Sequence, residues 1–325
     1  MALIEVRDLS REFTIRKKVR RSEARGNGLS PLRRTSVVKH AVHDLSFEID
    51  AGEMVGYIGP NGAGKSTTIK MLTGILVPSG GSARVAGLEP SRQRRELARR
   101  IGVVFGQRTS LWWDLPLRDS FELLRRIYRI PDKTFRRNLE DHVALLDLGD
   151  LMDTPVRQLS LGQRMRGDIA AALLHDPEIL YLDEPTIGLD VISKGRLREF
   201  LRALNHERGT TLMLTTHDLQ DIEALCDRVI VIDHGTAVFD GPLPSLRANG
   251  DASRTLVVDL VDEASPIAIE GARVVKVEGP RQWLSFPAGA SAAPLVAQVA
   301  AAYDVADLSI HEPDIEDVIR QLYSR

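Results

Sequence analysis

The chain lacks several features that would assign it to a well-defined class. Its 325 residues include one cysteine, Cys226, so neither an internal disulfide nor a cysteine metal cluster can form, as suits a reducing compartment. No apolar run approaches the roughly 18 residues of a membrane-spanning helix. The N-terminus MALIEVRDLS has no basic region followed by an apolar core. We therefore expect a cytosolic chain that reaches a membrane only through a partner.

Net charge is also nearly absent, since 43 lysines and arginines face 45 acidic residues and the formal charge is −2. A protein that coats nucleic acid normally carries a strong positive excess, so we expect no nucleic-acid partner. The exception is a basic insertion at about 16–39, which holds nine basic residues and one acid. It is consistent with a solvated hairpin, with contact to anionic headgroups, or with contact to nucleic acid.

The hydrophobic pattern predicts an α/β protein with two domains. Residues 3–9 and 42–50 alternate with period two, which predicts half-buried antiparallel strands. From Met54 onward, buried strands at 54–59, 179–183, 210–216 and 228–233 alternate with helical patterns, as in a parallel sheet covered by helices. Two helical stripes within 117–147 predict an inserted helical subdomain. With 43% hydrophobic residues, the chain can bury a sizeable core.

The pattern of predicted helices and strands changes after Asp240. Residues 241–254 read as a linker, and strands follow at 255–261, 272–278 and 281–286. An alanine-rich helix at 291–303 and an amphipathic helix at 315–323 complete the pattern. We expect a first domain at 1–245, with a helical subdomain at about 108–175, and a small α/β domain at 250–325.

The strongest motif is GPNGAGKS at 59–66, which fits the phosphate-binding loop G-x-x-x-x-G-K-[ST] between a predicted strand and a predicted helix. Gly62 and Gly64 let backbone N–H groups turn toward phosphates, and the start of a helix near Lys65 adds its positive dipole end. Lys65 would reach the β- and γ-phosphates, while the Ser66 hydroxyl would bind Mg²⁺. The loop predicts a nucleoside triphosphate site.

A second motif, ILYLDEP at 179–185, ends a buried strand with two adjacent carboxylates. Asp183 suits Mg²⁺, and Glu184 suits a general base that orients and deprotonates the attacking water. A third motif, LSLGQ at 159–163, precedes a helix with Ser160 as the expected N-cap. Its N-terminus is free to bind an anion.

These motifs together resemble those of the ATP-binding cassette (ABC) ATPases over about residues 3–240. The resemblance implies a P-loop NTPase fold with a parallel-sheet core, an antiparallel β subdomain and a helical subdomain. It implies catalytic roles for Glu184, His217 and Gln107, and metal binding by Ser66, Gln107 and Asp183. For ATP it implies the following residues: Phe13, Gly59, Asn61, Gly62, Gly64, Lys65, Ser66, Thr67, Ser160, Gly162, Gln163 and Asp190.

The signature departs from the family at Leu161, where glycine is commonest, but Ser160 and Gly162 are retained. Phe13 matches the adenine-stacking aromatic, and an ordinary core phenylalanine is the alternative.

The resemblance also implies partners. Because the chain carries one copy of each motif, a second cassette, identical or paralogous, is needed to complete the site around the γ-phosphate. The segment FGQRTSLWWDLP, with Trp112 and Trp113, and the tail HEPDIEDVIRQLY resemble subunits of two-component exporters that act with transmembrane permeases. A soluble mechanical ATPase of DNA repair or translation is the alternative. The short stretch between Gln107 and Leu159 leaves no room for the coiled coil of repair proteins.

Overall fold

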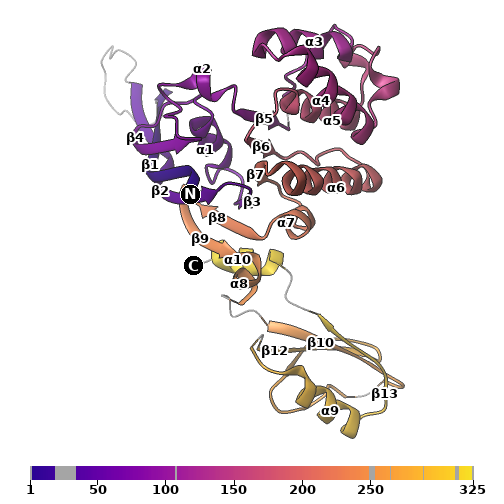
Figure 1. Ribbon diagram of the computed structural model, residues 1–325. Coiled ribbons are helices and arrows are strands. Elements are labelled where there is room, and N and C mark those ends of the chain that lie inside the picture. The colour runs from indigo at the N-terminus through magenta and orange to yellow at the C-terminus, as the bar shows by residue number, and fades with distance from the viewer. Residues whose placement is uncertain are drawn as a thin grey trace, which may run out of the picture. The chain divides into compact units, whose positions relative to one another are not determined.

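The computed structural model describes residues 2–18, 34–106, 108–248, 253–263, 265–287, 289–311 and 315–323. Most of the basic insertion and Gln107 lie outside these ranges. The described chain divides into two compact units, Met1–Asp240 and Gly241–Arg325, each with its own sheets and helices (Figure 1).

The first unit is built around a six-stranded sheet in the order β5-β6-β7-β3-β8-β9. The pairs β5–β6, β6–β7, β7–β3 and β3–β8 are parallel. The strands are β3 (Met54–Ile58), β5 (Ile101–Phe105), β6 (Ile179–Asp183), β7 (Thr211–Thr215), β8 (Arg228–Asp233) and β9 (Thr236–Pro242). The continuous apolar runs of β3, β6, β7 and β8 are those of strands buried on both faces, as the sequence predicts, whereas the edge strand β9 is mostly exposed.

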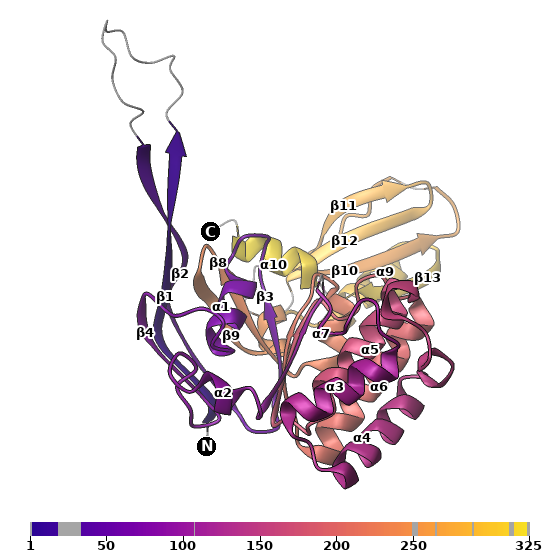
Figure 2. The ribbon, with the colours of Figure 1, turned by 90° about the horizontal axis from the view of Figure 1, so that it is seen from above.

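A second sheet, in the order β2-β1-β4, is antiparallel and consists of β1 (Ala2–Lys18), β2 (Arg34–Asp50) and β4 (Gly80–Val85). The ribbon of β1 and β2 is longer than the alternating pattern predicts, because register shifts between Val6 and Glu12 interrupt the alternation but not the pairing (Figure 2). An apolar core that includes Ile4, Phe47, Tyr57 and Leu72 joins this sheet to α1 and the parallel strands.

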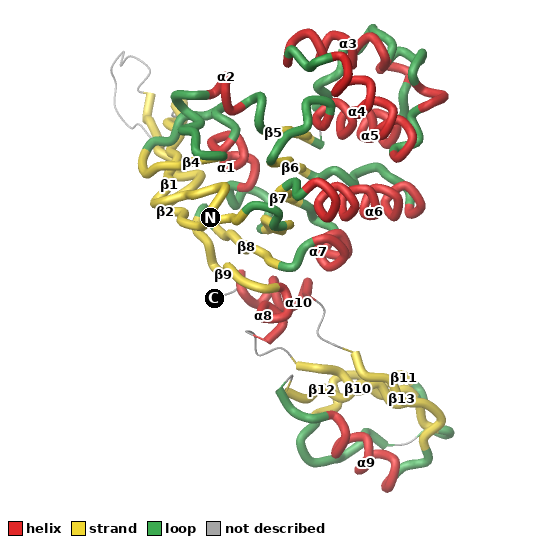
Figure 3. The backbone as a smooth tube through the Cα atoms, in the orientation of Figure 1, coloured by secondary structure: helices red, strands yellow, loops and turns green. Residues whose placement is uncertain are grey.

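The α-helices of the first unit are drawn in red in Figure 3. They are α1 (Lys65–Leu72), α2 (Arg94–Leu97), α3 (Leu117–Tyr128), α4 (Asp132–Leu145), α5 (Leu161–Leu173), α6 (Val191–Arg208) and α7 (Leu219–Leu225), with short 3₁₀ turns at Gly149–Leu151 and Val156–Gln158. The apolar stripes predicted within 117–147 are buried on α3 and α4, for example at Phe121 and Phe135. The expected helical subdomain is therefore present.

The second unit contains an antiparallel sheet in the order β11-β12-β10-β13, with α9 contributing to its core. Its elements are α8 (Leu243–Ala248), β10 (Ser253–Leu260), β11 (Arg273–Glu278), β12 (Arg281–Pro287), α9 (Ala292–Ala302), β13 (Val305–His311) and α10 (Ile315–Tyr323). The prediction of a linker at 241–254 is wrong, because this stretch includes the end of β9, the helix α8 and the start of β10. Pro244 is tolerated in α8 because it lies in the first turn.

Candidate functional site

The phosphate loop links β3 to α1, where the sequence predicts it. Gly62 and Gly64 have φ values of 88° and 108°, in the left-handed region that favours glycine. A Cβ on Gly64 would lie 2.5 Å from the backbone oxygen of Ala41. The loop therefore requires glycine there for both conformation and space.

Lys65 opens α1 and is 8% exposed. Its Nζ donates to the backbone oxygens of Gly59 at 2.5 Å and Pro60 at 3.2 Å. Burial lowers the pKa of the Lys65 ammonium, and the carboxylates of Glu184 and Asp183 act in the opposite direction. The lysine is therefore held within the loop, near two negative charges contributed by β6 and the turn after it.

Ser66 and Asp183, which are 117 positions apart, meet across the sheet edge. Ser66 Oγ donates to Asp183 Oδ2 at 3.1 Å, and Thr215 Oγ1 donates to Oδ1 at 2.5 Å. A hydroxyl and a carboxylate are the hard oxygen donors that Mg²⁺ prefers. The donor chemistry here therefore fits that ion. The Thr215 contact was not anticipated from the sequence.

Glu184 lies next to Asp183 and has φ of 56°, an unusual conformation for a residue with a Cβ. Its N–H donates to Thr215 O at 2.8 Å. His217 follows β7, and its Nε2 lies 2.9 Å from Glu184 Oε1. The parallel arrangement of β6 and β7 thus brings the two predicted catalytic side chains into contact.

A cavity of about 590 Å³ lies over the phosphate loop. Glu184 lines the cavity, together with eight of the residues that the family resemblance implies for ATP or metal. These eight are Phe13, Asn61, Gly62, Gly64, Lys65, Ser66, Thr67 and Asp183. Phe13 therefore lines this cavity, and the guanidinium of Arg11 lies 4.9 Å from its ring centroid. Three cations that sequence reasoning missed, Lys39, Lys70 and Arg108, also line the cavity.

The signature residues lie elsewhere. Ser160 is the N-cap of α5, as predicted, and forms a capping box with Gln163: Ser160 Oγ accepts from Gln163 N at 3.2 Å, and Gln163 Oε1 accepts from Ser160 N at 2.9 Å. Ser160, Gly162 and Gln163 are not among the described residues that line the cavity. Leu161, the departure from the family signature, lies against Gly188, whose Cβ would come within 2.4 Å of it.

Asp190 is also away from the cavity and caps α6, accepting from Ser193 N at 2.9 Å and Ser193 Oγ at 2.7 Å. These hydrogen bonds, led by the backbone one, lower the pKa of the Asp190 carboxyl. Gln107 lies outside the described residues. Cys226 is a free, buried cysteine.

Comparison with known proteins gives consistent similarities. Residues 42–187 match the family model described as ABC transporter. The chain is 36% identical over 244 residues to the ABC transporter ATP-binding protein NatA of Bacillus subtilis, covering 75% of this chain and 91% of NatA. It is 31% identical to the daunorubicin resistance ATP-binding protein DrrA3 of Streptomyces coeruleorubidus, covering 87% of this chain and 91% of that protein.

The fold gives the same result. A solved ATP-binding subunit of an ABC transporter aligns with a TM-score of 0.62 at 26% identity, covering 75% of this chain and 92% of that one. The phosphate loop, the paired carboxylates and these similarities agree, and the chain belongs to the family of ABC transporter ATPases.

Proposed function

We propose that this ATPase powers a membrane exporter and that Glu184 is the general base of ATP hydrolysis. The observation that carries the proposal is the contact of Glu184 with His217, 2.9 Å apart, beside the Ser66–Asp183 pair at the phosphate cavity. A carboxylate in that place can orient and deprotonate the water that attacks the γ-phosphate.

The remaining residues would divide the work of binding. The loop N–H groups and Lys65 hold the phosphates, and Phe13 stacks on the base. Ser66 and Asp183 would hold Mg²⁺, with Gln107 as the third group that the family resemblance implies. When bound, the ion neutralises charge on the transferred phosphoryl group. His217 would contact the γ-phosphate and hold Glu184 in place.

A second cassette would complete the site. The signature lies outside the cavity, so Ser160 and Gly162 are available to a triphosphate held by another chain. Apolar side chains on this side of the molecule are unusually exposed, namely Leu161 (39%), Ile187 (42%), Val191 (86%) and Ile192 (71%). Exposure of this kind supports a protein interface. The simplest partner is a second copy of this chain, which would form an ATP-dependent dimer.

Attachment to the membrane would come through a permease. None of the helices in the described ranges is long and apolar enough to span a bilayer. A cavity of about 170 Å³ between the sheet and the helical subdomain is lined by apolar residues such as Ile75, Leu124 and Tyr128. We expect a permease to dock on the cytoplasmic side at this cavity and at the half-exposed side chains of Trp112 and Trp113. The drug-resistance relative supports export over repair or translation.

The test is Glu184→Gln in the purified chain. We expect ATP to bind with unchanged affinity while kcat falls on the order of 10²-fold or more, since a positioned general base contributes about 10² to 10⁴. ATP should then trap a dimer, visible by size-exclusion chromatography. Hydrolysis by this variant at the wild-type rate would show that Glu184 is not the base.

A further inference from the structure

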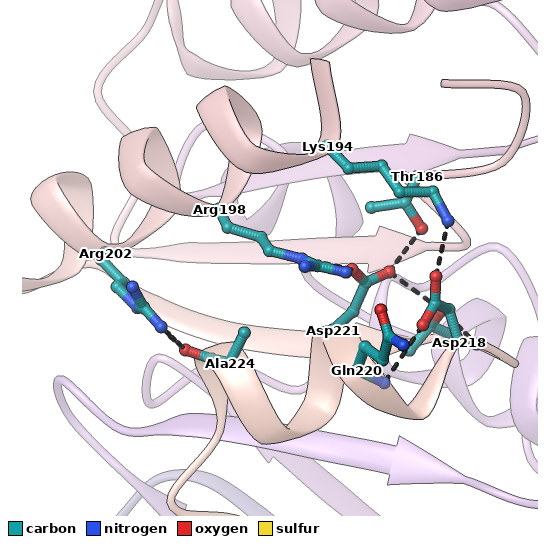
Figure 4. A network of polar contacts seen from close by, with 9 residues as sticks. Thr186, Lys194, Arg198, Arg202, Asp218, Gln220, Asp221 and Ala224 are labelled. Atoms are coloured by element: carbon teal, nitrogen blue, oxygen red, sulfur yellow. Dashed lines mark hydrogen bonds and ion pairs between the residues drawn. The ribbon is translucent and has the colours of Figure 1, made fainter. Parts of the chain in front are cut away.

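Asp221 is a buried carboxylate that none of the roles above uses. It lies in the first turn of α7 and is 0% exposed. Its Oδ2 accepts from Thr186 Oγ1 at 2.5 Å, and its Oδ1 accepts from Arg198 Nε at 2.7 Å (Figure 4). A buried carboxylate is costly unless it is paired and hydrogen-bonded, so these donors are required where Asp221 stands.

Two hydroxyl groups near Asp221 adjoin the proposed catalytic pair. Thr186 is two residues after Glu184, and Thr216, whose Oγ1 lies 3.5 Å from Asp221 Oδ2, immediately precedes His217. Both threonines are 4% exposed. One carboxylate is thus linked to both loops that carry the catalytic side chains.

The backbone at Glu184 needs such a restraint. A φ of 56° is energetically unfavourable for a residue with a Cβ. Before Glu184, the chain is held by the sheet pairing of β6, and at Glu184 by the N–H bond to Thr215. After Glu184, the Thr186–Asp221 bond fixes the loop from a different element, so its loss would free Glu184 to relax.

The packing of α6 on α7 does not depend on this bond. Lys194 Nζ donates to Asp218 Oδ2 at 2.5 Å, and Arg202 Nε donates to Ala224 O at 2.8 Å (Figure 4). Removing the Thr186 hydroxyl therefore removes the link to the catalytic loop and leaves the two helices joined. This separates a positioning role from a structural one.

We propose that Asp221 is a positioning residue that holds Glu184 against His217 through the Thr186 hydroxyl. The inference rests on the proposed function of Glu184. It assigns to the loop after Glu184 a direct effect on turnover, independent of nucleotide binding.

The test is Thr186→Val, which keeps the shape of the side chain and removes its hydroxyl. A hydrogen bond to a charged group corresponds to about a tenfold to hundredfold rate change when its effect falls on the transition state alone. We expect kcat to fall about tenfold or more while the KM for ATP stays within about twofold. Thr186→Ser, which keeps the hydroxyl, should retain the wild-type kcat. In an Asp221→Asn background, adding Thr186→Val should change kcat little further, since Thr186 and Asp221 act through the same hydrogen bond.

The matched control is Arg202→Gln, which removes a tie between the same helices away from the catalytic loops. It should lower the melting temperature and leave kcat unchanged. The inference is overturned if Thr186→Val keeps the wild-type kcat, if it changes KM instead, or if Arg202→Gln lowers kcat equally. Should Thr186→Val fail to fold, Thr186→Ala makes the same comparison. Glu184→Gln is measured alongside: if it remains fully active, the proposed function fails first, whereas an inactive Glu184→Gln with a fully active Thr186→Val rejects only the inference.

Discussion

At the residue scale, positive φ values mark two points of the site for opposite reasons. Gly64 adopts φ of 108° where any Cβ would meet the backbone oxygen of Ala41 at 2.5 Å, so only glycine fits. Glu184 adopts φ of 56° in spite of its Cβ; its N–H donates to Thr215 of β7, and Thr186, two residues further on, donates to Asp221 of α7. The first position is dictated by local sterics and the second by tertiary contacts.

The buried His142 on α4 makes folding stability depend on pH. It is 1% exposed, and neither ring nitrogen has a hydrogen-bond partner in the described part of the chain. Burial, followed by the nearby Arg208, lowers its pKa from 6.5 to about 4. Between these two pH values His142 is protonated in the unfolded chain but not in the folded chain. The free energy of unfolding therefore decreases as the pH falls below 6.5.

We expect this one group to cost about 2 kcal/mol of unfolding free energy between pH 7.5 and pH 5. In His142→Leu, urea unfolding at the two pH values should show a loss smaller by about that amount. Equal losses in the two proteins would mean that the imidazole is protonated in the folded state. His175→Gln, at a half-buried ring whose Nε2 lies 3.0 Å from Ile101 O, is the comparison variant and should change the pH dependence less.

The residues that sequence reasoning found and missed differ in one physical respect. The phosphate-loop residues can be recognised because binding phosphate requires a fixed local spacing, which is visible in the sequence. They are Gly62, Gly64, Lys65 and Ser66. The contact of Thr215 with Asp183 depends on the order of β6 and β7 in the sheet, which no local spacing reveals. Asp221 could not be singled out from the linear sequence, because its partners are brought to it only by the fold.

At the element scale, the segment between β5 and α3 has a backbone held independently of its two tryptophans. Asp168 of α5, 6% exposed, accepts from Ser110 N at 2.8 Å and from Thr109 Oγ1 at 2.9 Å. Trp112 N donates to Ser120 Oγ at 3.2 Å. The indoles themselves remain 37% and 50% exposed, with Arg164 5.3 Å from the Trp113 ring centroid.

The double substitution Trp112→Ala, Trp113→Ala should therefore leave the chain folded and able to bind ATP. If the indoles anchor the permease, it should weaken that contact by about 2 kcal/mol or more, which is typical of aromatic anchors. Co-purification with the co-expressed permease is the measurement, and Trp283→Ala, at another partly exposed tryptophan, is the control. An unfolded double variant would show that both rings are needed for packing, and intact co-purification would move the docking site elsewhere.

Elements are predicted best where one pattern runs through them. The parallel strands are continuous apolar runs, and α3 and α4 carry regular stripes, so their existence is evident from the sequence. The helix α8 is hidden because Pro242 and Pro244 suggest a break, and six residues are too few for a periodic signal. The basic insertion stays a prediction, since most of it lies outside the described residues.

At the scale of the whole molecule, the two units have separate apolar cores. The core of the second includes Leu256, Leu284, Phe286 and Val299, contributed by β10, β12 and α9. The candidate catalytic residues described above all lie in the first unit. Independent cores predict that each unit keeps its fold when separated.

The point of separation also follows from these elements. A cut near residue 245, the end of the expected first domain, would divide α8, which packs against α10 of the same unit. We expect a fragment of residues 1–242 to be soluble and to bind ATP within about threefold of the full chain, because it retains the whole phosphate cavity. Residues 1–248 form the matched control, since that fragment keeps α8 without α10 and should be less soluble. Thermal unfolding and fluorescent ATP binding on both fragments make the comparison. An insoluble or nucleotide-blind 1–242 fragment would mean that the second unit completes the cassette core, whereas a fragment that binds ATP but no longer supports transport would assign the second unit to dimerisation or coupling.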